Sequence, residues 1–242
     1  MIRLILVLLY VFLFFVLSIL IFPIEWVIGK FSPHAKGISS LRMVQFIFKS
    51  ILFFSSTKIT VIGEENVPKD VPVLYVGNHR SYFDIIITYA RCPRETGYMA
   101  KKEMKKVPFL NWWMMNLHCL FLDRKDIKQG LKTILEAIDL IKSGVSVCIF
   151  PEGTRNESAD PLEVSTFHEG SFKVASKTGC PIIPMALTGT SKIFEDQFPK
   201  IHPHEIILEY GRPIYPKELS KEDQKRLGGY AREQIIQMLK NH

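Results

Sequence analysis

An uncharged apolar run near the start of the chain, Leu4–Phe22, constrains the fold more than any other feature. As an α-helix rising ~1.5 Å per residue it would be about 28 Å long, close to the thickness of a bilayer's hydrocarbon core. Pro23 follows directly and is expected to end the helix. A cleaved signal peptide is the alternative, since Arg3 supplies a short positive region, but the run is long for one and no small-x-small site follows. The run therefore predicts a retained, membrane-associated helix.

A second helix is predicted between residues 41 and 52, where apolar residues recur at helical spacing and polar residues share the opposite face. The apolar residues are Leu41, Val44, Ile47, Phe48, Ile51 and Leu52, and the polar ones are Arg42, Gln45 and Lys49. Two interpretations stay open. The helix packs on the core of the remaining chain, or it lies in the lipid headgroup layer with its cations among anionic lipids.

The charge balance calls for a negatively charged partner, because 31 Lys and Arg against 24 Asp and Glu give a net charge of +7. With an apolar N-terminal segment, that partner is expected to be membrane lipid and not nucleic acid. Lys30, Lys36 and Arg42 outnumber Arg3, so the C-terminal part should face the cytoplasm if the first helix crosses. The expected location is the cell (inner) membrane. None of the four cysteines forms a CxxC pair or stands near a histidine at zinc spacing, so we expect no metal site.

Strand and helix patterns alternate after Phe54, which predicts an α/β fold with a largely parallel or mixed sheet flanked by helices. The domain division is therefore residues 1–55 as a membrane-associated helical pair and residues 56–242 as the α/β domain. Predicted strands are 58–62, 71–76, 120–122, 145–150, 182–187 and, as an edge strand, 205–210. Predicted helices start near Tyr82, follow an Asp126 cap to Gly144, cover 172–177, and run from a Ser220 cap to Leu239.

The segment Asn78–Asp84 directly follows a predicted strand, and ligands of such sheets bind beyond the carboxyl ends of the strands. Ser81 and Asp84 fit an N-cap and N3 pair at the start of a helix. The Asp84 carboxylate would lie near His79 and could accept a hydrogen bond from one ring nitrogen, leaving the other as a base aimed at a substrate hydroxyl. A capping aspartate beside an incidental surface histidine is the alternative.

Two further segments end in arginine after predicted strands: Phe150–Arg155 and Phe121–Arg124. Arg155 and Arg124 could each donate two hydrogen bonds to a phosphate. Glu152 could bind a glycerol hydroxyl or hold Arg155 in place. The alternatives are a plain charged turn for the first segment and, for Arg124, a surface ion pair with Asp123 or Asp126.

Together these motifs resemble the lysophosphatidate acyltransferases, formally 1-acyl-sn-glycerol-3-phosphate acyltransferases, within the glycerolipid acyltransferase superfamily. The family's NHxSxxD, F-[LI]-D-R, FPEGTR and proline-containing apolar blocks are matched in order by Asn78–Asp84, Phe121–Arg124, Phe150–Arg155 and Ile182–Met185. The resemblance implies His79 as general base, Asp84 as its orienting partner, and Arg124, Glu152, Gly153 and Arg155, with Thr154 in the same block, as the acceptor-binding set. It implies direct transfer without an acyl-enzyme.

One departure from the family lies at Phe167–Gly170, where the family often shows Phe-Lys-x-Gly and this chain has His168. The change leaves Lys173 to substitute as a phosphate contact. Lys101, Lys102, Lys105 and Lys106 form a basic patch for which four interpretations remain: an anionic lipid surface, the acidic carrier or CoA of the donor, the acceptor phosphate (for which Lys105 is the candidate), or a solvated face.

The resemblance therefore implies an acyltransferase with no cofactor, which moves a fatty acyl group from acyl-CoA or acyl carrier protein to the sn-2 hydroxyl of lysophosphatidic acid and yields phosphatidic acid. Glycerol-3-phosphate or another lysophospholipid is the alternative acceptor. A membrane-bound lipid or thioester hydrolase with Ser81 or Ser171 as nucleophile, and a lipid-binding protein without activity, are the alternatives of other classes. The oxyanion-stabilising donors are left open, with Asn78 and a backbone N–H near Gly153 as candidates.

Overall fold

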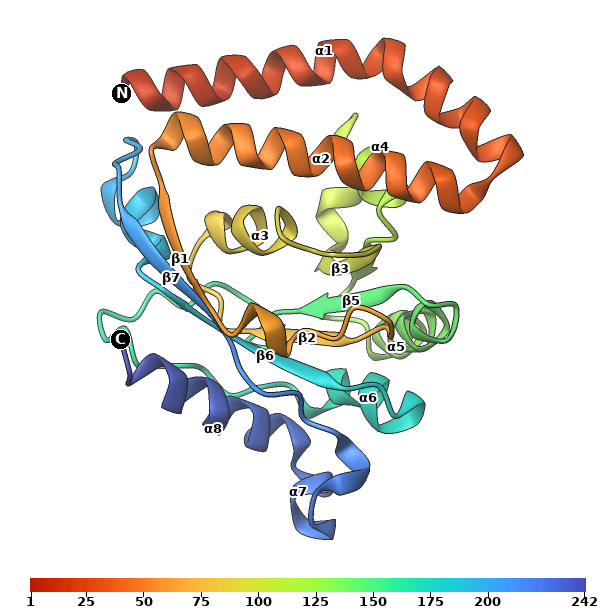
Figure 1. The fold of residues 1–242 in the computed structure, drawn as a ribbon, viewed down its shortest axis with the longest axis vertical. Coiled ribbons are helices and arrows are strands. Elements are labelled where there is room, and N and C mark those ends of the chain that lie inside the picture. The colour runs from red at the N-terminus through yellow and green to blue at the C-terminus, as the bar shows by residue number, and fades with distance from the viewer.

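A seven-stranded mixed sheet forms the centre of the protein in a computed structural model that describes residues 1–242 (Figure 1). The strand order is β1-β7-β6-β2-β5-β3-β4, and every neighbouring pair is parallel except β6 and β7. The predicted α/β class and mixed sheet are thus confirmed. The strands are β1 (Lys58–Ile62), β2 (Leu74–Gly77), β3 (Thr96–Lys101), β4 (Leu120–Leu122), β5 (Ser146–Ile149), β6 (Ile182–Thr188) and β7 (Glu205–Tyr210).

Helices cover both faces of this sheet (Figure 1). On one face lie α1 (Ile2–Phe31), α2 (Pro33–Ser55), α3 (Tyr82–Tyr89) and α4 (Leu110–Asn116); on the other lie α5 (Ile127–Lys142), α6 (Lys173–Thr178) and α8 (Leu227–Leu239), with the short α7 (Lys221–Lys225) before α8. Alternate residues of a strand enter opposite cores: Tyr75 joins the α1–α4 side, whereas Leu74 and Val76 join the α5–α8 side. The central strands are therefore buried on both faces, as their continuous apolar sequence requires.

The helices α1 and α2 run antiparallel and lie side by side along the α/β domain (Figure 1). The N-terminal end of α1 reaches the end of α2, where Arg3 Nε donates to Ser56 Oγ over 3.4 Å. The two helices are also joined by hydrogen bonds, since the buried Glu25 of α1 accepts from the hydroxyls of Ser39 and Ser40 of α2. The prediction that Pro23 ends the first helix is wrong: α1 continues through it to Phe31. The helix bends in its second half, and Pro23 permits this because proline has no backbone N–H to donate to the preceding turn.

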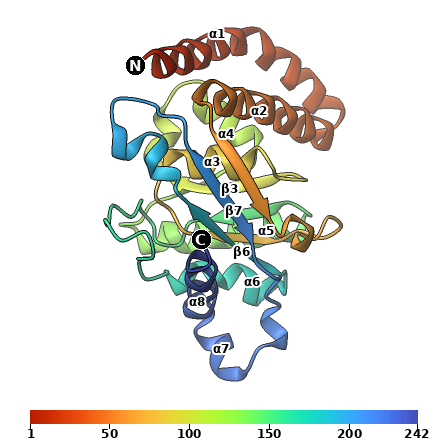
Figure 2. The same cartoon turned by 60° about the vertical axis from the view of Figure 1, so that its left-hand side comes forward.

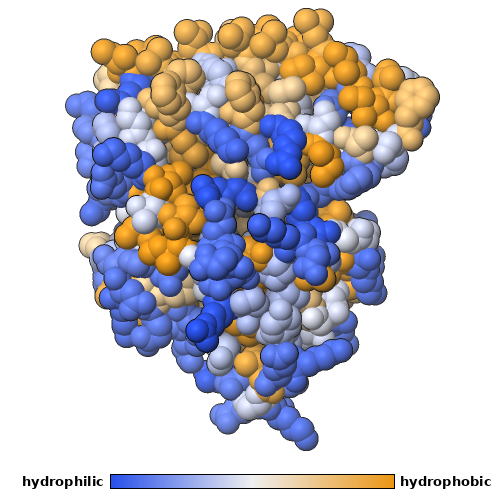
Figure 3. All heavy atoms as spheres, in the orientation of Figure 1, coloured by the Kyte–Doolittle hydropathy of each residue, from blue (hydrophilic) through white to orange (hydrophobic).

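The outward surface of α1 is almost entirely apolar and exposed (Figure 3). Both α1 and α2 are long and apolar enough to cross a membrane by length and composition. The outward side chains are Ile5, Leu8, Leu9, Phe12, Leu13, Val16, Leu20, Ile24 and Trp26, joined by Phe46 and Phe53 of α2 and by Trp112 of α4.

The apolar face of α2 packs onto the α/β domain, which is the first of the two interpretations given above. Leu41, Val44 and Ile47 are buried in the same core as the sheet residues. Gln45, expected on the polar outer face, is buried and donates to the backbone oxygen of Cys92 over 2.7 Å. Arg42 and Lys49 remain exposed. The end of α2 at Ser55 coincides with the boundary drawn at residue 55, while the core runs continuously across it.

Two sequence predictions about the C-terminal part are wrong. β7 is not an edge strand, because β1 pairs with it in parallel and forms the edge instead (Figure 2). The last helix is not continuous, since α7 ends at Lys225 and α8 begins at Leu227. The chain turns at Arg226, whose guanidinium pairs with Asp223 and Glu233 on the two sides of the break.

Candidate active site

The loops that follow β2 and β5 meet at the carboxyl end of the sheet. The two strands are parallel neighbours, with Val76 opposite Ile149. Their loops therefore leave the sheet at the same edge, where open α/β sheets bind ligands. The loop after β2 carries His79 and leads into α3, and the loop after β5 carries Phe150–Arg155.

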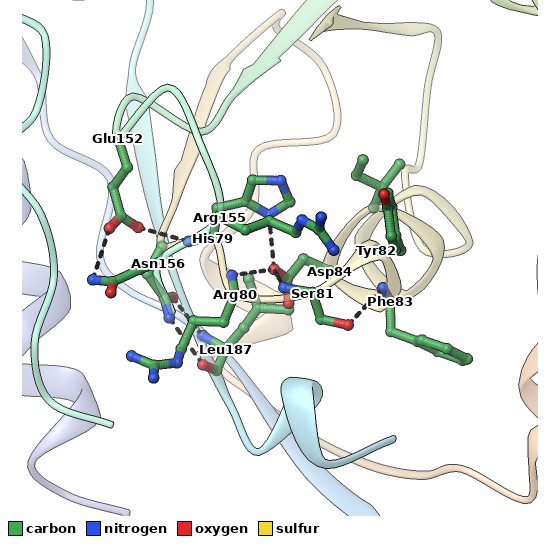
Figure 4. A network of polar contacts seen from close by, with 12 residues as sticks. His79, Arg80, Ser81, Tyr82, Phe83, Asp84, Glu152, Arg155, Asn156 and Leu187 are labelled. Atoms are coloured by element: carbon green, nitrogen blue, oxygen red, sulfur yellow. Dashed lines mark hydrogen bonds and ion pairs between the residues drawn. The ribbon is translucent and has the colours of Figure 1, made fainter. Parts of the chain in front are cut away.

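His79 and Asp84 form a hydrogen-bonded pair in the first of these loops (Figure 4). The distance from His79 Nδ1 to Asp84 Oδ2 is 2.8 Å. A carboxylate can only accept, so the neutral ring donates from Nδ1 and keeps its lone pair on Nε2. Asp84 is fully buried, and Nε2 of His79 makes no hydrogen bond within the protein. The geometry thus leaves one ring nitrogen free as a base.

The start of α3 explains why Asp84 is held in this position. Ser81 is the N-cap of α3, with its hydroxyl accepting from Phe83 N, and Asp84 Oδ2 accepts from Ser81 N over 2.7 Å to complete a capping box. The same oxygen also accepts from Arg80 N over 2.7 Å. The capping role and the histidine-orienting role, which the sequence presents as alternatives, therefore coexist on one oxygen atom.

The imidazole of His79 is also fixed by packing. Its ring stacks on Phe150, with centroids 4.5 Å apart and planes 22° from parallel. Only 15% of the His79 side chain is exposed. The stacking and the Asp84 hydrogen bond together restrict the direction of the free nitrogen, and a base is effective only when its lone pair already points at the proton it removes.

Glu152 connects the two loops and forms no hydrogen bond or ion pair with Arg155. Its Oε1 accepts from His79 N over 2.7 Å, and its Oε2 accepts from Ser165 N over 2.8 Å and from the Asn156 amide. The side chain is buried. The backbone oxygen of His79 in turn accepts a hydrogen bond from Asn156 N over 2.7 Å. Glu152 therefore lies where it can position the histidine, with both oxygens already in use.

Arg155 is held by an acid that the sequence analysis did not identify, Glu195. Arg155 Nη1 lies 3.2 Å from Glu195 Oε1, and its guanidinium lies over the Tyr82 ring, 4.0 Å from the centroid. Glu195 also accepts from Ser81 Oγ over 2.6 Å and from Tyr82 N over 2.8 Å. Nothing in the sequence around Glu195 signals this role, because its partners are distant along the chain: Arg155 is 40 positions away, and Ser81 and Tyr82 are 114 and 113 positions away.

Arg155 lines a cavity of about 470 Å³ on this side of the α3 start. Its wall includes Arg80, Tyr82, Glu195 and Phe198. The guanidinium of Arg80 donates to the backbone oxygens of Ser158, Asp160 and Glu163, so it braces the loop after Arg155.

Arg124 lines a second cavity, of about 210 Å³, together with Phe150, Gly153 and His168. Arg124 makes no hydrogen bond or ion pair within the chain, because Asp123 pairs with Lys102 and Asp126 caps α5. The predicted alternative of a surface ion pair for Arg124 is therefore wrong. Desolvation lowers the pKa of Arg124, yet an arginine stays charged at neutral pH. This cavity is thus lined by an unpaired cation and by Phe150, the ring that stacks on His79.

The remaining predicted binding residues lie outside both cavities. Thr154, Lys105 and Lys173 are exposed and line neither. His168, which stands where the family often has lysine, borders Gly153: a Cβ built on Gly153 would lie 3.3 Å from His168 Nε2. The positive φ of Gly153 also disfavours a side chain there.

Both proposed oxyanion donors are engaged inside the protein. The Asn78 amide exchanges two hydrogen bonds with the backbone of Leu187, at 3.0 and 2.8 Å, and thereby connects the His79 loop to β6. The N–H of Gly153 donates to Phe150 O within its own turn. The hydrogen bonds of both groups serve the loop conformation.

Comparisons with known proteins identify the family of this chain. The model of the acyltransferase family matches residues 58–188, a span that contains both loops. The chain belongs to the acyltransferase family. It is 32% identical over 211 residues to the 1-acyl-sn-glycerol-3-phosphate acyltransferase of Borreliella burgdorferi, covering 83% of this chain and 79% of that one. It is 30% identical over 183 residues to the enzyme of the same name from Saccharomyces cerevisiae, covering 75% of this chain and 60% of that one.

A solved structure has the same overall fold. The crystal structure of the 1-acyl-sn-glycerophosphate (LPA) acyltransferase PlsC from Thermotoga maritima matches with a TM-score of 0.77 and 26% identity, over 100% of this chain and 98% of that one. The match includes the N-terminal helices, so their arrangement along the sheet belongs to the shared fold. The chain is therefore an acyltransferase with a PlsC-like fold.

Proposed function

We propose that this acyltransferase moves a fatty acyl group from acyl-CoA or acyl carrier protein to the sn-2 hydroxyl of lysophosphatidic acid, yielding phosphatidic acid. The observation that carries the proposal is a histidine with one nitrogen bonded to a buried carboxylate and the other free. Its ring stacks on Phe150, which lines the cavity of an unpaired arginine. The names of the relatives from Borreliella burgdorferi and Saccharomyces cerevisiae support the choice of acceptor.

In the proposed reaction, His79 Nε2 takes the proton of the acceptor hydroxyl as its oxygen attacks the thioester carbonyl carbon. The imidazolium that forms is stabilised by Asp84, whose carboxylate already accepts the Nδ1 hydrogen. When the tetrahedral intermediate collapses, the C–S bond breaks and the leaving sulfur takes the proton back from Nε2. The base is regenerated and no cofactor is consumed. A general base of this kind contributes roughly 10²–10⁴-fold to the rate.

We assign the acceptor phosphate to the Arg124 cavity. Arg124 has no carboxylate partner, so its charge is available to a phosphomonoester as a two-pronged donor. Arg155 is already paired with Glu195 and stacked on Tyr82. For that reason we assign Arg155 to holding the start of α3, with any contact to substrate made from this fixed position.

We further propose that α1 and α2 lie within one leaflet, at the cytoplasmic face of the cell membrane. α1 lies along the α/β domain, so a crossing orientation would draw the charged domain into the hydrocarbon layer. Lying flat, α1 buries its exposed apolar surface in lipid, with the Trp26 and Trp112 rings at the boundary where indoles concentrate.

The surroundings of Ser81 argue against the alternative function of a hydrolase. Its hydroxyl is fully buried, donates to Glu195 and accepts from Phe83 N, so it has no path to a substrate carbonyl. Ser171 lines the Arg124 cavity but has no histidine hydrogen-bonded to its hydroxyl, as an activated serine needs.

An acceptor panel tests the proposal directly. Purified full-length protein in mixed micelles is given acyl-CoA with lysophosphatidic acid, glycerol-3-phosphate, lysophosphatidylcholine or lysophosphatidylethanolamine, and thiol release is followed. We expect release only with an acceptor, fastest with lysophosphatidic acid. Release without an acceptor would favour a hydrolase, and a preference for acceptors lacking a phosphomonoester would overturn the Arg124 assignment.

A further inference from the structure

The solvent face of α5 carries a stripe of apolar side chains that the acyltransferase chemistry does not use. Ile127 is 90% exposed, and Leu131 and Leu135 are each 53% exposed. The three are spaced by four residues, so they lie one above the other on a single face of the helix. The buried face is formed by other residues, namely Thr133, Ile134, Ala137, Ile138 and Ile141. The stripe is therefore additional to what α5 needs for its own packing, and such surfaces mark interaction sites.

Cations flank this stripe along its N-terminal half. Lys125, Lys128 and Lys132 are exposed, and the one ion pair that any of them forms joins Lys132 to Glu136 over 3.9 Å. Asp126, at the same end of the helix, has its carboxylate bound to the first backbone N–H groups of α5. An apolar centre with a cationic rim fits the surface of an acidic protein.

The position of the stripe separates it from the membrane-seeking surface. α5 covers the face of the sheet opposite to α1 and α2 (Figure 1). When the apolar surface of α1 is seated in lipid, the outward face of α5 is directed away from that layer. Its exposed leucines therefore fit a partner from the aqueous phase better than a lipid surface.

The stripe begins at the mouth of the Arg124 cavity. Ile127 lines this cavity together with Gly130 of α5 and with Phe150, the ring that stacks on His79. A thioester presented by a partner on α5 would enter this cavity at Ile127 and meet Phe150, the ring that stacks on His79. A long flexible arm is needed to carry the thioester into the cavity.

We propose that the α5 docking face, defined as Lys125, Ile127, Lys128, Leu131, Lys132 and Leu135, binds the acidic acyl carrier protein that delivers the acyl group on its phosphopantetheine arm. The proposal rests on the proposed acyl transfer from a thioester and names the donor's binding surface. The carrier's carboxylates face the three lysines, its apolar surface covers the leucines, and its arm enters the cavity at Ile127.

The first measurement is binding, which does not depend on turnover. Full-length protein is immobilised in detergent micelles, and the association of acyl carrier protein carrying a palmitoyl thioester is followed by surface plasmon resonance. The variant Lys128→Glu/Lys132→Glu reverses two charges of the docking face, and we expect it to raise the Kd tenfold or more. Lys142→Glu makes the same change at the far end of α5, outside the stripe, and should leave the Kd within twofold.

The second measurement separates the two donors with lysophosphatidic acid as acceptor. For Lys128→Glu/Lys132→Glu and for Leu131→Ser, we expect the KM for acyl carrier protein to rise about tenfold while kcat/KM with acyl-CoA stays within twofold. Unchanged acyl-CoA kinetics also show that the variants are folded. An inactive wild-type protein that still binds carrier through these lysines would contradict the proposed function and support the docking face.

Three results would overturn the docking face. The wild-type protein shows no saturable carrier binding; the charge reversal leaves carrier binding and the carrier's KM unchanged; or the charge reversal lowers sedimentation with phosphatidylglycerol vesicles while sparing carrier binding. The last result would make α5 a lipid contact.

Discussion

The loops after β2 and β5 lie side by side, yet they use their charged side chains in different ways. In the first loop, one carboxylate oxygen of Asp84 collects hydrogen bonds from the His79 ring and from two backbone N–H groups. In the second, the two oxygens of Glu152 accept hydrogen bonds from His79 N and Ser165 N, and Arg155 pairs with Glu195. The first loop presents a ring nitrogen without a hydrogen bond, whereas the second mainly holds the first in place.

This difference separates groups that act from groups that position. A side chain that reacts must keep one polar atom free, and within these two loops His79 Nε2 meets that requirement while the Glu152 oxygens do not. Arg124, from a third loop, also meets it. Substitutions in the first loop should therefore lower the rate of the chemical step, and those in the second should act through the placement of the first.

The largest effect is expected for His79→Ala, which removes the free nitrogen. We expect kcat with lysophosphatidic acid and acyl-CoA to fall by about 10²–10⁴-fold with little change in KM. His202→Ala, an exposed histidine in the loop before β7, is the matched control. Full activity in His79→Ala would mean that another group acts as the base.

A somewhat smaller loss is expected for Asp84→Asn. The amide keeps the shape but carries no negative charge to stabilise the imidazolium, so we expect kcat to fall by about 10²-fold. Replacing the buried carboxylate with an amide also changes its hydrogen bonds, which we expect to lower the free energy of unfolding by about 1–3 kcal/mol. Steady-state kinetics and urea unfolding measure the two effects, with Asp139→Asn on the exposed face of α5 as control.

The smallest of the three effects is expected for Glu152→Gln, the test of the second loop. A glutamine offers one carbonyl oxygen where two oxygens now accept from His79 N and Ser165 N, so one backbone donor meets an N–H₂ group. We expect kcat to fall several-fold and the free energy of unfolding to drop by about 1–3 kcal/mol. Glu157→Gln, an exposed acid of the same loop, should change neither. A loss as large as in His79→Ala would assign Glu152 a direct part in the chemistry.

Local signals explain which parts of the fold the sequence could predict. The Ser81 cap, the Asp126 cap and the strand Lys58–Ile62 rest on neighbouring residues, and the structure has all three as predicted. The strand Thr96–Lys101 was not predicted, because its residues show no alternation of apolar and polar side chains. β7 was assigned to an edge, since the sequence does not report that β1 pairs outside it.

The site follows the same rule. The His79–Asp84 pair lies within one loop and helix turn, so its spacing was informative. Contacts between distant segments decide the rest of the site. They determine which acid pairs with Arg155, why Arg124 has no partner, and which groups donate to the two oxygens of Glu152. The mixed polarity of α2 was informative about a helix but misleading about Gln45, whose side chain satisfies buried backbone oxygens next to α3.

The proposed placement of α1 and α2 within one leaflet changes what concentration would mean for this acyltransferase. Seated in that way, the protein would hold the His79 loop at a fixed height above the membrane plane, and the proposed acceptor, lysophosphatidic acid, would reach it by lateral diffusion. The supply of acceptor would then be set by its mole fraction in the leaflet, so neutral lipid added to the same vesicles would slow the reaction although nothing dissolved in water has changed.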